Sequence, residues 1–276
     1  MKQFSLIKPL LVTTLLFSGA IQAAPDARQV LAVSPVDDIV AHYPAMMSQG
    51  IREGLIQSEK LSPMMANTIG NLVGSSFSAE EIEQQIITNL QASLTSSQLQ
   101  AVHDWYETPV AKKITAAEIV ASMPSEWEKV RARAAELNRQ YKGTLKADMF
   151  DRFDRAARAT ETAVDTTIAV QLGLASSMAA FSSDSANHEE LRQRIESQRG
   201  ALRGIVGQQV FDSYLYTYEN IGAQEMDLYL SFLESSAGTA FSNVVTDSIQ
   251  RAITEPVERI GKQVSGFLSP DSPAAQ

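Results

Sequence analysis

The stretch LTSSQLQAVHDWYETPVAKKI, residues 94–114, decides the fold class of this chain. Its apolar residues recur three or four positions apart, which is typical of a helix that buries one face. Thr95 opens a capping-box pattern. Pro109 suits a second helix start, because proline at the first helical position gives up only an amide that has no partner. We therefore predict two short helices, 95–107 and 109–121, that meet at a corner.

The apolar skeleton of this stretch recurs further along the chain. A shift of 127 positions pairs it without a gap with IGAQEMDLYLSFLESSAGTAF, so that Trp105 meets Phe232. Upstream, VDDIVA from Val36 pairs with VDTTIA from Val164 at an offset of 128. Two separated segments that agree on nearly one offset indicate an internal duplication.

Most of the remaining chain shows the same helical spacing, and strand signals are scarce. The segment YLYTY, 214–218, alternates aromatic residues as a strand would, but with Phe211 and Leu215 it also fits one helical face. Because no partner strand is visible, and a lone strand cannot satisfy its backbone, we predict a helix there. Ser78 and Ser125 open further capping-box patterns and mark two more helix starts.

These signals predict an all-α protein of two related multi-helix domains joined by a charged helical connector. Residues 1–23 form the expected signal peptide, 24–124 the first helical domain, 125–159 the connector, 160–268 the second helical domain and 269–276 a disordered tail. The tail has the Pro, Ser and small residues typical of disorder.

The beginning of the chain has the pattern of a secretory signal. Lys2 and Lys8 precede an apolar run, and the small-residue tail SGAIQAAP follows, with cleavage expected after Ala23. The run is shorter than the roughly 20 residues that a bilayer-spanning helix needs. The chain has no cysteine, so it carries neither a disulfide nor a lipid-modified cysteine. We expect export to the periplasm of a bacterium with two membranes.

The charge balance limits the partners of the protein. The whole chain has a net charge of −9, and the first 23 residues hold two lysines and no acid, so the mature charge is −11. Such a protein repels polyanions, which argues against nucleic acid and anionic lipid head groups. Another envelope or secreted protein is the expected partner, with no stable membrane insertion.

The corner resembles the signature of the bacterial domain of unknown function 2059, in which a helix and an aromatic pair precede a small or Ser/Thr-Pro corner and then Gly-Lys. The matching residues of the first copy are Trp105, Tyr106, Thr108, Pro109, Lys112 and Lys113. Ala111 stands where glycine is common. Those of the second copy are Phe232, Glu234, Ser235, Ala237 and Gly238, with Thr239 in place of the lysine. The resemblance implies a secreted, all-helical protein and transfers no catalytic residue.

The sequence offers no catalytic, cofactor-binding or metal-binding residue. His103 and Asp104 fall opposite Leu230 and Ser231 of the second copy, so the polar pair is not shared. We interpret His103 as a surface or half-buried side chain, and Trp105 with Tyr106 as core anchors of the corner. The three histidines lack the spacing of a metal site, and no serine-hydrolase, phosphate-loop or dinucleotide motif is present.

Three aspartates of DMFDRFDRAAR could suggest a cation site. Each is followed four residues later by an arginine, so ion pairs along one helix explain them better. The expected pairs are Asp148 with Arg152, Asp151 with Arg155 and Asp154 with Arg158.

The most consistent function is a non-catalytic, protein-binding or chaperone-like adaptor of the cell envelope, with a groove between the two copies for an apolar segment of a partner. One alternative is an envelope hydrolase that uses dispersed carboxylates such as Glu107 and its counterpart Glu234. A second is a peripheral membrane protein, because residues 163–181 are rich in small and weakly polar side chains, although a buried helix also explains them.

Overall fold

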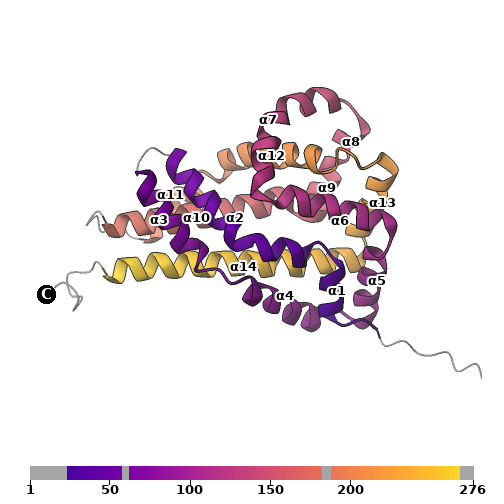
Figure 1. Cartoon of the computed structure of the whole chain (residues 1–276), viewed down its shortest axis with the longest axis horizontal. Coiled ribbons are helices and arrows are strands. Elements are labelled where there is room, and N and C mark those ends of the chain that lie inside the picture. Colours follow the sequence, from indigo (N-terminus) through magenta and orange to yellow (C-terminus); the bar gives the residue numbers. More distant parts are fainter. Residues whose placement is uncertain (1–23, 58–61, 182–187, 268–276) are drawn as a thin grey trace, which may run out of the picture.

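The chain folds entirely into helices wherever the computed structural model describes it, at residues 24–57, 62–181 and 188–267 (Figure 1). No strand occurs in these ranges, so the all-α prediction is confirmed. The helices are α1 (Ala27–Val33), α2 (Val36–Gln57), α3 (Pro63–Gly74), α4 (Ala79–Ser93), α5 (Ser96–Tyr106), α6 (Pro109–Ser122), α7 (Pro124–Tyr141), α8 (Leu145–Asp148), α9 (Phe150–Ala157), α10 (Ala159–Phe181), α11 (His188–Glu196), α12 (Arg199–Thr217), α13 (Ala223–Leu233) and α14 (Ser236–Phe267). The expected signal peptide, 1–23, and the tail, 269–276, lie outside the described residues.

Two of the predicted helix starts on the opening stretch are confirmed by their caps. The Thr95 hydroxyl accepts from the Gln98 amide at 3.3 Å, and the Gln98 side chain accepts from the Thr95 amide at 3.0 Å, which completes the capping box. The Thr108 hydroxyl accepts from the Ala111 amide at 3.1 Å, with Pro109 in the first helical position. These local bonds fix the ends of α5 and α6 and therefore the corner between them.

The predicted start at Ser125 is wrong. Helix α7 begins one residue earlier, at Pro124, and its N-cap is Met123, whose side chain makes no capping bond. Proline has the backbone angle of the first helical turn built into its ring, so Pro124 sets the start and places Ser125 inside the helix. At Ser78 the prediction holds, since its hydroxyl accepts from the Glu81 amide at 3.2 Å.

The aromatic segment at 214–218 lies at the end of α12, as predicted, rather than in a strand. Tyr214 and Leu215 are buried, and the Tyr214 ring packs against Phe150 and Phe153 of α9. The burial of successive rings on one face of α12 explains the aromatic run, because a helix directs residues three and four apart to the same side.

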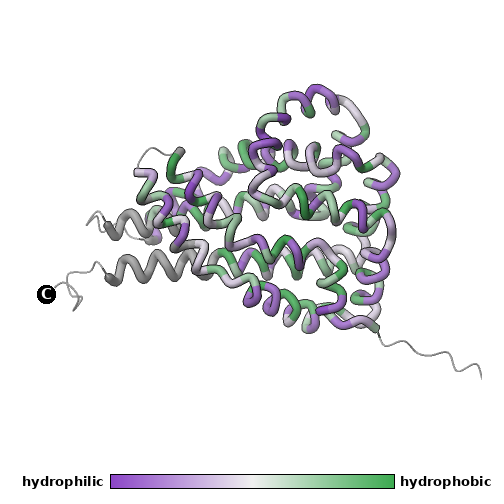
Figure 2. The backbone as a smooth tube through the Cα atoms, in the orientation of Figure 1, coloured by the Kyte–Doolittle hydropathy of each residue, from purple (hydrophilic) through white to green (hydrophobic). Residues whose placement is uncertain are grey.

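The two predicted domains share one core rather than forming two. The largest cluster of buried side chains combines residues of both sequence halves, among them Val30, Leu90, Val102, Tyr214, Leu230 and Phe241. Helix α4 of the first half packs against α14, and α12 of the second half packs against α6 (Figure 1). Along most helices the apolar residues alternate with hydrophilic ones, as expected of helices that bury one face (Figure 2). A division into two separate domains is therefore not confirmed.

The charged connector is part of this packed body. It bends at Gly143, whose φ of +69° is the left-handed conformation that glycine adopts without strain. Helix α7 then packs against α12, and α9 packs against α13. Leu137 and Met149 of the connector are buried in the shared core. The connector thus fills space between the two halves instead of tethering them.

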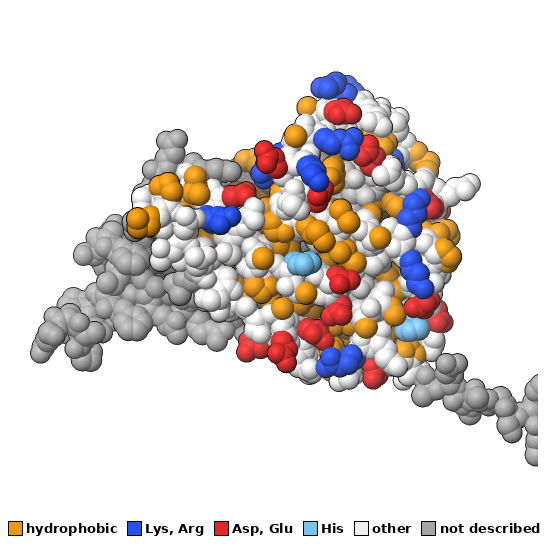
Figure 3. Space-filling model, viewed as in Figure 1, with side chains coloured by type: hydrophobic (Ala, Val, Ile, Leu, Met, Phe, Trp, Pro, Cys, Tyr) orange, Lys and Arg blue, Asp and Glu red, His pale blue; other side chains and the backbone are white. Residues whose placement is uncertain are grey.

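The burial of helix α10 and the distribution of charge on the surface limit where partners can bind. Val164, Ile168 and Leu172 of α10 are buried, so this part of the weakly polar segment 163–181 faces a core. No helix in the described ranges is long and apolar enough to cross a membrane. On the face seen in Figure 3, Lys and Arg side chains are scattered among Asp and Glu instead of forming a basic patch.

Candidate functional site

The two corners of the proposed repeat follow the same backbone path. Helices α5 and α13 both have 11 residues, and Glu107 and Glu234 are their C-caps in the same right-handed conformation. The next helices begin two residues after each glutamate, and the Ser235 hydroxyl accepts from the Gly238 amide at 3.0 Å, as Thr108 does from Ala111. The correspondence runs residue by residue at the offset found in the sequence.

Aromatic rings of both corners pack directly on one another. The ring of Trp105 lies 4.8 Å from that of Phe232 with a 10° angle between their planes, and 6.2 Å from Tyr229. Tyr106 meets Phe232 and Phe241 edge-on. Tyr106 and Phe232 are buried, whereas Trp105 is half-buried. The rings therefore close the surface between the corners, where the sequence had suggested a groove, and act as scaffold.

The polar pair of the opening stretch does not form a catalytic arrangement. His103 is half-buried, and its Nδ1 lies 3.8 Å from the Asp104 carboxylate without a hydrogen-bond partner in the described part of the chain. Asp104 is exposed and accepts instead from the Gln100 side chain at 2.7 Å. A general base needs a nucleophile and an orienting group within hydrogen-bond reach. Across the described residues, no group of three His, Cys, Asp or Glu side chains could hold a metal ion.

The two glutamates of the hydrolase alternative are each tied to a cation. Glu107 accepts from Lys112 Nζ at 2.7 Å, and Glu234 accepts from Arg152 at 2.8 Å. These hydrogen bonds hold the pKa of both carboxyl groups below the usual range. A general acid must carry a proton near neutral pH, so neither carboxyl group is suited to that role.

The predicted ion pairs along the connector are wrong. Arg152 binds Asp227 at 2.9 Å and Glu234 at 2.8 Å, and Arg158 binds Asp247 at 3.0 Å, all in the second half. The Asp154 carboxylate instead accepts from the Thr160 amide at 2.7 Å. Helix α9 ends at Ala157, and Arg158 has a φ of +52°, so Asp154 and Arg158 do not share a helical face. The arginines anchor the connector to α13 and α14.

The carboxyl group of the half-buried Glu118 joins three helices near the corners. Glu118 of α6 accepts hydrogen bonds at its Oε1 from the hydroxyls of Tyr218 and Tyr229, each at 2.7 Å. Burial raises the pKa of Glu118, and the two hydrogen bonds oppose that shift. Burial also raises the pKa of both tyrosines well above the usual value, so both hydroxyls stay donors at neutral pH. This junction satisfies a polar group in the core, which is a structural role.

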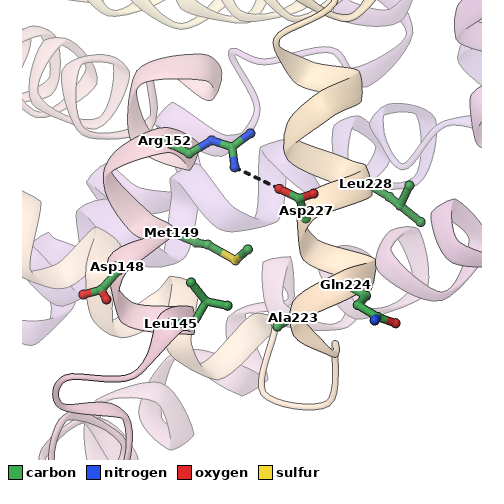
Figure 4. Close-up of a pocket in the computed structure, with 8 residues that line it drawn as sticks. All are labelled: Leu145, Asp148, Met149, Arg152, Ala223, Gln224, Asp227 and Leu228. Carbon is green, nitrogen blue, oxygen red and sulfur yellow. Dashed lines mark hydrogen bonds and ion pairs between the residues drawn. The ribbon is translucent and has the colours of Figure 1, made fainter.

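An open groove lies beside the second corner, between α8–α9 and α13 (Figure 4). Its volume is about 670 Å³. Leu145 and the buried Met149 point from the connector toward α13, and Ala223 lies opposite them at the start of α13. Leu228 lies on the outer side of α13. Leu145 is 59% exposed and Leu228 is 53% exposed, so two large apolar side chains of the groove lining are open to a partner.

The charged residues of the groove stand at its ends. The Arg152 guanidinium and the Asp227 carboxylate meet across one end of the gap, and the dashed line of Figure 4 marks their ion pair. Asp148 lies on the outer side of α8 and is exposed. The groove thus combines an apolar floor with an ion-paired end and a carboxylate at its rim. Such an arrangement can bind an apolar segment, and it presents no nucleophile with a base beside it.

Sequence reasoning missed both the groove and the Glu118 junction. Leu145 follows the break at Gly143, and Leu228 falls between the core positions of α13, so each breaks the apolar spacing of its helix. That departure is the signal that could have identified them. For Glu118 the sequence gives no comparable signal, because its tyrosine partners lie 100 and 111 residues away.

The comparison with protein families gives one match. Residues 80–140 match the model of a family described as an uncharacterized protein conserved in bacteria (DUF2059). The matched residues run from α4 to the end of α7 and include the first corner, in agreement with the resemblance found in its sequence. Neither the curated proteins nor the solved structures contain a match to this chain.

Proposed function

We propose that this protein is a non-catalytic, protein-binding module of the bacterial cell envelope, of an adaptor or chaperone-like kind, and that it holds an apolar segment of another envelope or secreted protein. The observation that supports this most is the groove between α8–α9 and α13, where the exposed Leu145 lies beside the buried Met149 and the exposed Leu228 lies on the outer side of α13. Apolar side chains that stay exposed in a groove with a polar rim are typical of interaction sites.

The competing hydrolase function has less support. Its two candidate carboxylates, Glu107 and Glu234, are held ionised by Lys112 and Arg152. The peripheral membrane alternative is also less favoured, because the side chains of α10 that the structure describes are mostly buried or half-buried. A binding role requires no reactive group and is therefore the simplest function for this surface.

Two further parts of the proposal concern origin and location. The equal lengths of α5 and α13, and the same conformation of their C-caps Glu107 and Glu234, support an internal duplication, with the second corner as the diverged copy. The pattern of the first 23 residues supports export to the periplasm after cleavage behind Ala23. N-terminal sequencing of the protein from a periplasmic extract tests this location, and recovery of the uncleaved chain in the cytoplasm would contradict it.

Site-specific photocrosslinking in living cells tests the binding function. A photoreactive amino acid at Leu145 or Leu228 should give one shared crosslinked protein, whereas the same amino acid at Ile205 should not. Ile205 is a suitable control because it is 61% exposed on α12 and does not line the groove. Equal crosslinking at all three positions, or none at the two leucines, would contradict the proposal.

A further inference from the structure

We propose that the groove between α8–α9 and α13 selects a basic apolar segment of its partner, in which a leucine-like side chain lies next to a lysine or arginine. This inference rests on the proposed binding function and adds the chemistry of the occupant. The apolar part follows from Leu145 and Leu228, which line the groove and leave exposed hydrocarbon that a partner side chain can cover.

The basic part follows from the charges around the groove. Arg152 is the one cation among the residues that line it, and its guanidinium already binds both Asp227 and Glu234. One positive charge is therefore shared by two carboxylates. Asp148 adds a third carboxylate, which has no ion-pair partner within the described ranges. Among the residues that line the groove, two carboxylates, Asp148 and Asp227, outnumber the one guanidinium of Arg152, so the lining carries an excess of one negative charge that a cationic partner can neutralise.

The same charges disfavour the other occupants. A second copy of this chain would bring a net charge of −9 toward an acidic groove, which opposes self-association. An anionic lipid surface is repelled for the same reason. A segment that is apolar but acidic would meet the carboxylate of Asp148 at the rim. A basic apolar segment is the occupant that satisfies both the leucines and the carboxylates.

Binding of designed peptides to the purified chain tests this inference. Three fluorescent 14-residue peptides share leucines at helical spacing and carry lysine, glutamine or glutamate at the remaining positions. We expect the lysine peptide to bind at least about tenfold more tightly than the glutamate peptide, and to weaken as salt is added. Fluorescence anisotropy gives the dissociation constants.

Four variants assign the binding to the groove. Leu228→Ser should weaken all peptides that bind, whereas Asp148→Asn should weaken the lysine peptide alone, by about two- to fivefold, as expected for one exposed ion pair. The matched controls are Ile205→Ser on α12 and Glu190→Gln on α11, at the opposite end of the molecule (Figure 1). Both controls should leave the dissociation constants unchanged.

The outcomes separate this inference from the function on which it rests. If the three peptides bind equally and Leu228→Ser still weakens them, the binding function stands and the selection of basic segments is overturned. If no peptide binds, or if Glu190→Gln weakens the lysine peptide as much as Asp148→Asn does, the groove has no such role and both proposals fall. Sedimentation of a wild-type dimer that Leu228→Ser dissociates would assign the groove to a second copy and would also overturn the inference.

Discussion

The corner between α5 and α6 and the corner between α13 and α14 have the same backbone path and different side chains. Where the first has the half-buried His103, the second has the fully buried Leu230. Where the first has Trp105 at the edge of the core, the second has the buried Phe232. The difference shows that matching C-caps and helix lengths can give one backbone path to two corners whose side chains differ in burial.

The corners also differ in how tightly they turn. Ala111 fits into the first corner and is buried there. At the equivalent Gly238 a methyl group would overlap the carbonyl oxygen of Phe232. Glycine is therefore required by close approach in the second corner only. The same local sequence pattern thus occurs in one corner that holds a methyl group and in another that has no room for one.

The largest expected effect comes from the stacked rings that join the corners. Phe232→Ala should lower the free energy of unfolding by about 3–5 kcal/mol, because it removes a buried ring, and the half-buried Trp105→Ala should cost less. Since the rings stack, the double variant should show a coupling of about 0.5–1.5 kcal/mol in urea unfolding. Losses that simply add would mean that the corners do not support each other. Trp105→Phe serves as a control, because it keeps a ring and removes an indole N–H for which the described residues supply no hydrogen-bond partner.

The second prediction compares the buried Leu230 with the half-buried His103, which occupy equivalent positions in the two corners. Leu230→Ala should cost about 2–5 kcal/mol, because the side chain is fully buried, whereas His103→Ala should change the free energy of unfolding by less than about 0.5 kcal/mol. Denaturant unfolding of both variants gives the comparison. Loss of partner binding in a normally folded His103→Ala protein would show that the first corner has a functional role that the second lacks.

The third prediction concerns the turn itself. Gly238→Ala should cost about 1–3 kcal/mol, since the added methyl group forces the Phe232 carbonyl aside. The reverse change in the first corner, Ala111→Gly, should cost about 0.5–1 kcal/mol, because glycine loses more conformational freedom in a helix. Thermal unfolding of the two variants measures the asymmetry. Equal costs would mean that the corners turn equally tightly.

The smallest expected effect concerns Glu118, which connects α6 of the first corner to Tyr229 of the second. Its pKa in the folded protein is raised from the ordinary value of 4.5, so its contribution to stability is complete below that pH and is lost as the pH rises through the folded pKa. Glu118→Gln keeps an acceptor for the tyrosine hydroxyls and cannot ionise. The variant should therefore gain stability relative to the wild type between about pH 4.5 and neutrality.

The comparison must be made as a difference between variant and wild type at each pH. Carboxylates such as Glu225, whose pKa is lowered by its hydrogen bond with Lys113, lose their stabilising contribution as the pH falls and act in the opposite direction. They contribute equally to both proteins and cancel. A difference that stays constant with pH would show that the pKa of Glu118 is the same in the folded and the unfolded chain, and would contradict the prediction.

Features that depend on near neighbours in the sequence were predictable. The cap at Thr95 joins residues three apart and follows from the capping-box pattern, and the start of α6 follows from Pro109. The helical state of residues 214–217 followed from spacing along one face. The predicted helix start at Ser125 was wrong because two start signals overlap there, and the helix begins at the proline one residue earlier. Interactions between residues close in the sequence were thus sufficient to predict the helical state and most of the helix ends named from the sequence.

Features that depend on distant residues were not predictable from one sequence. The sequence pattern placed Asp148 four residues before Arg152 and predicted an ion pair between them. The partners of Arg152 instead lie 75 and 82 residues away. The groove depends on how α8 is placed against α13, and a helical pattern does not specify which helix it will meet. For the same reason the proposed repeat suggested two domains, although the two halves of the chain share one core.

The interlocked packing of the two halves determines when this protein can fold. Helix α4 depends on α14 for its cover, and the hydrogen bond between Asn89 and Ser248 joins residues 159 positions apart. The apolar faces of the first half of a nascent chain therefore cannot be fully buried until nearly the whole polypeptide, including α14, has been synthesised. Contacts of such long sequence separation slow folding and lengthen the time that apolar faces remain exposed. Truncation within α14 should consequently destabilise α4, in the first half of the sequence, as much as it destabilises the helices next to the truncation.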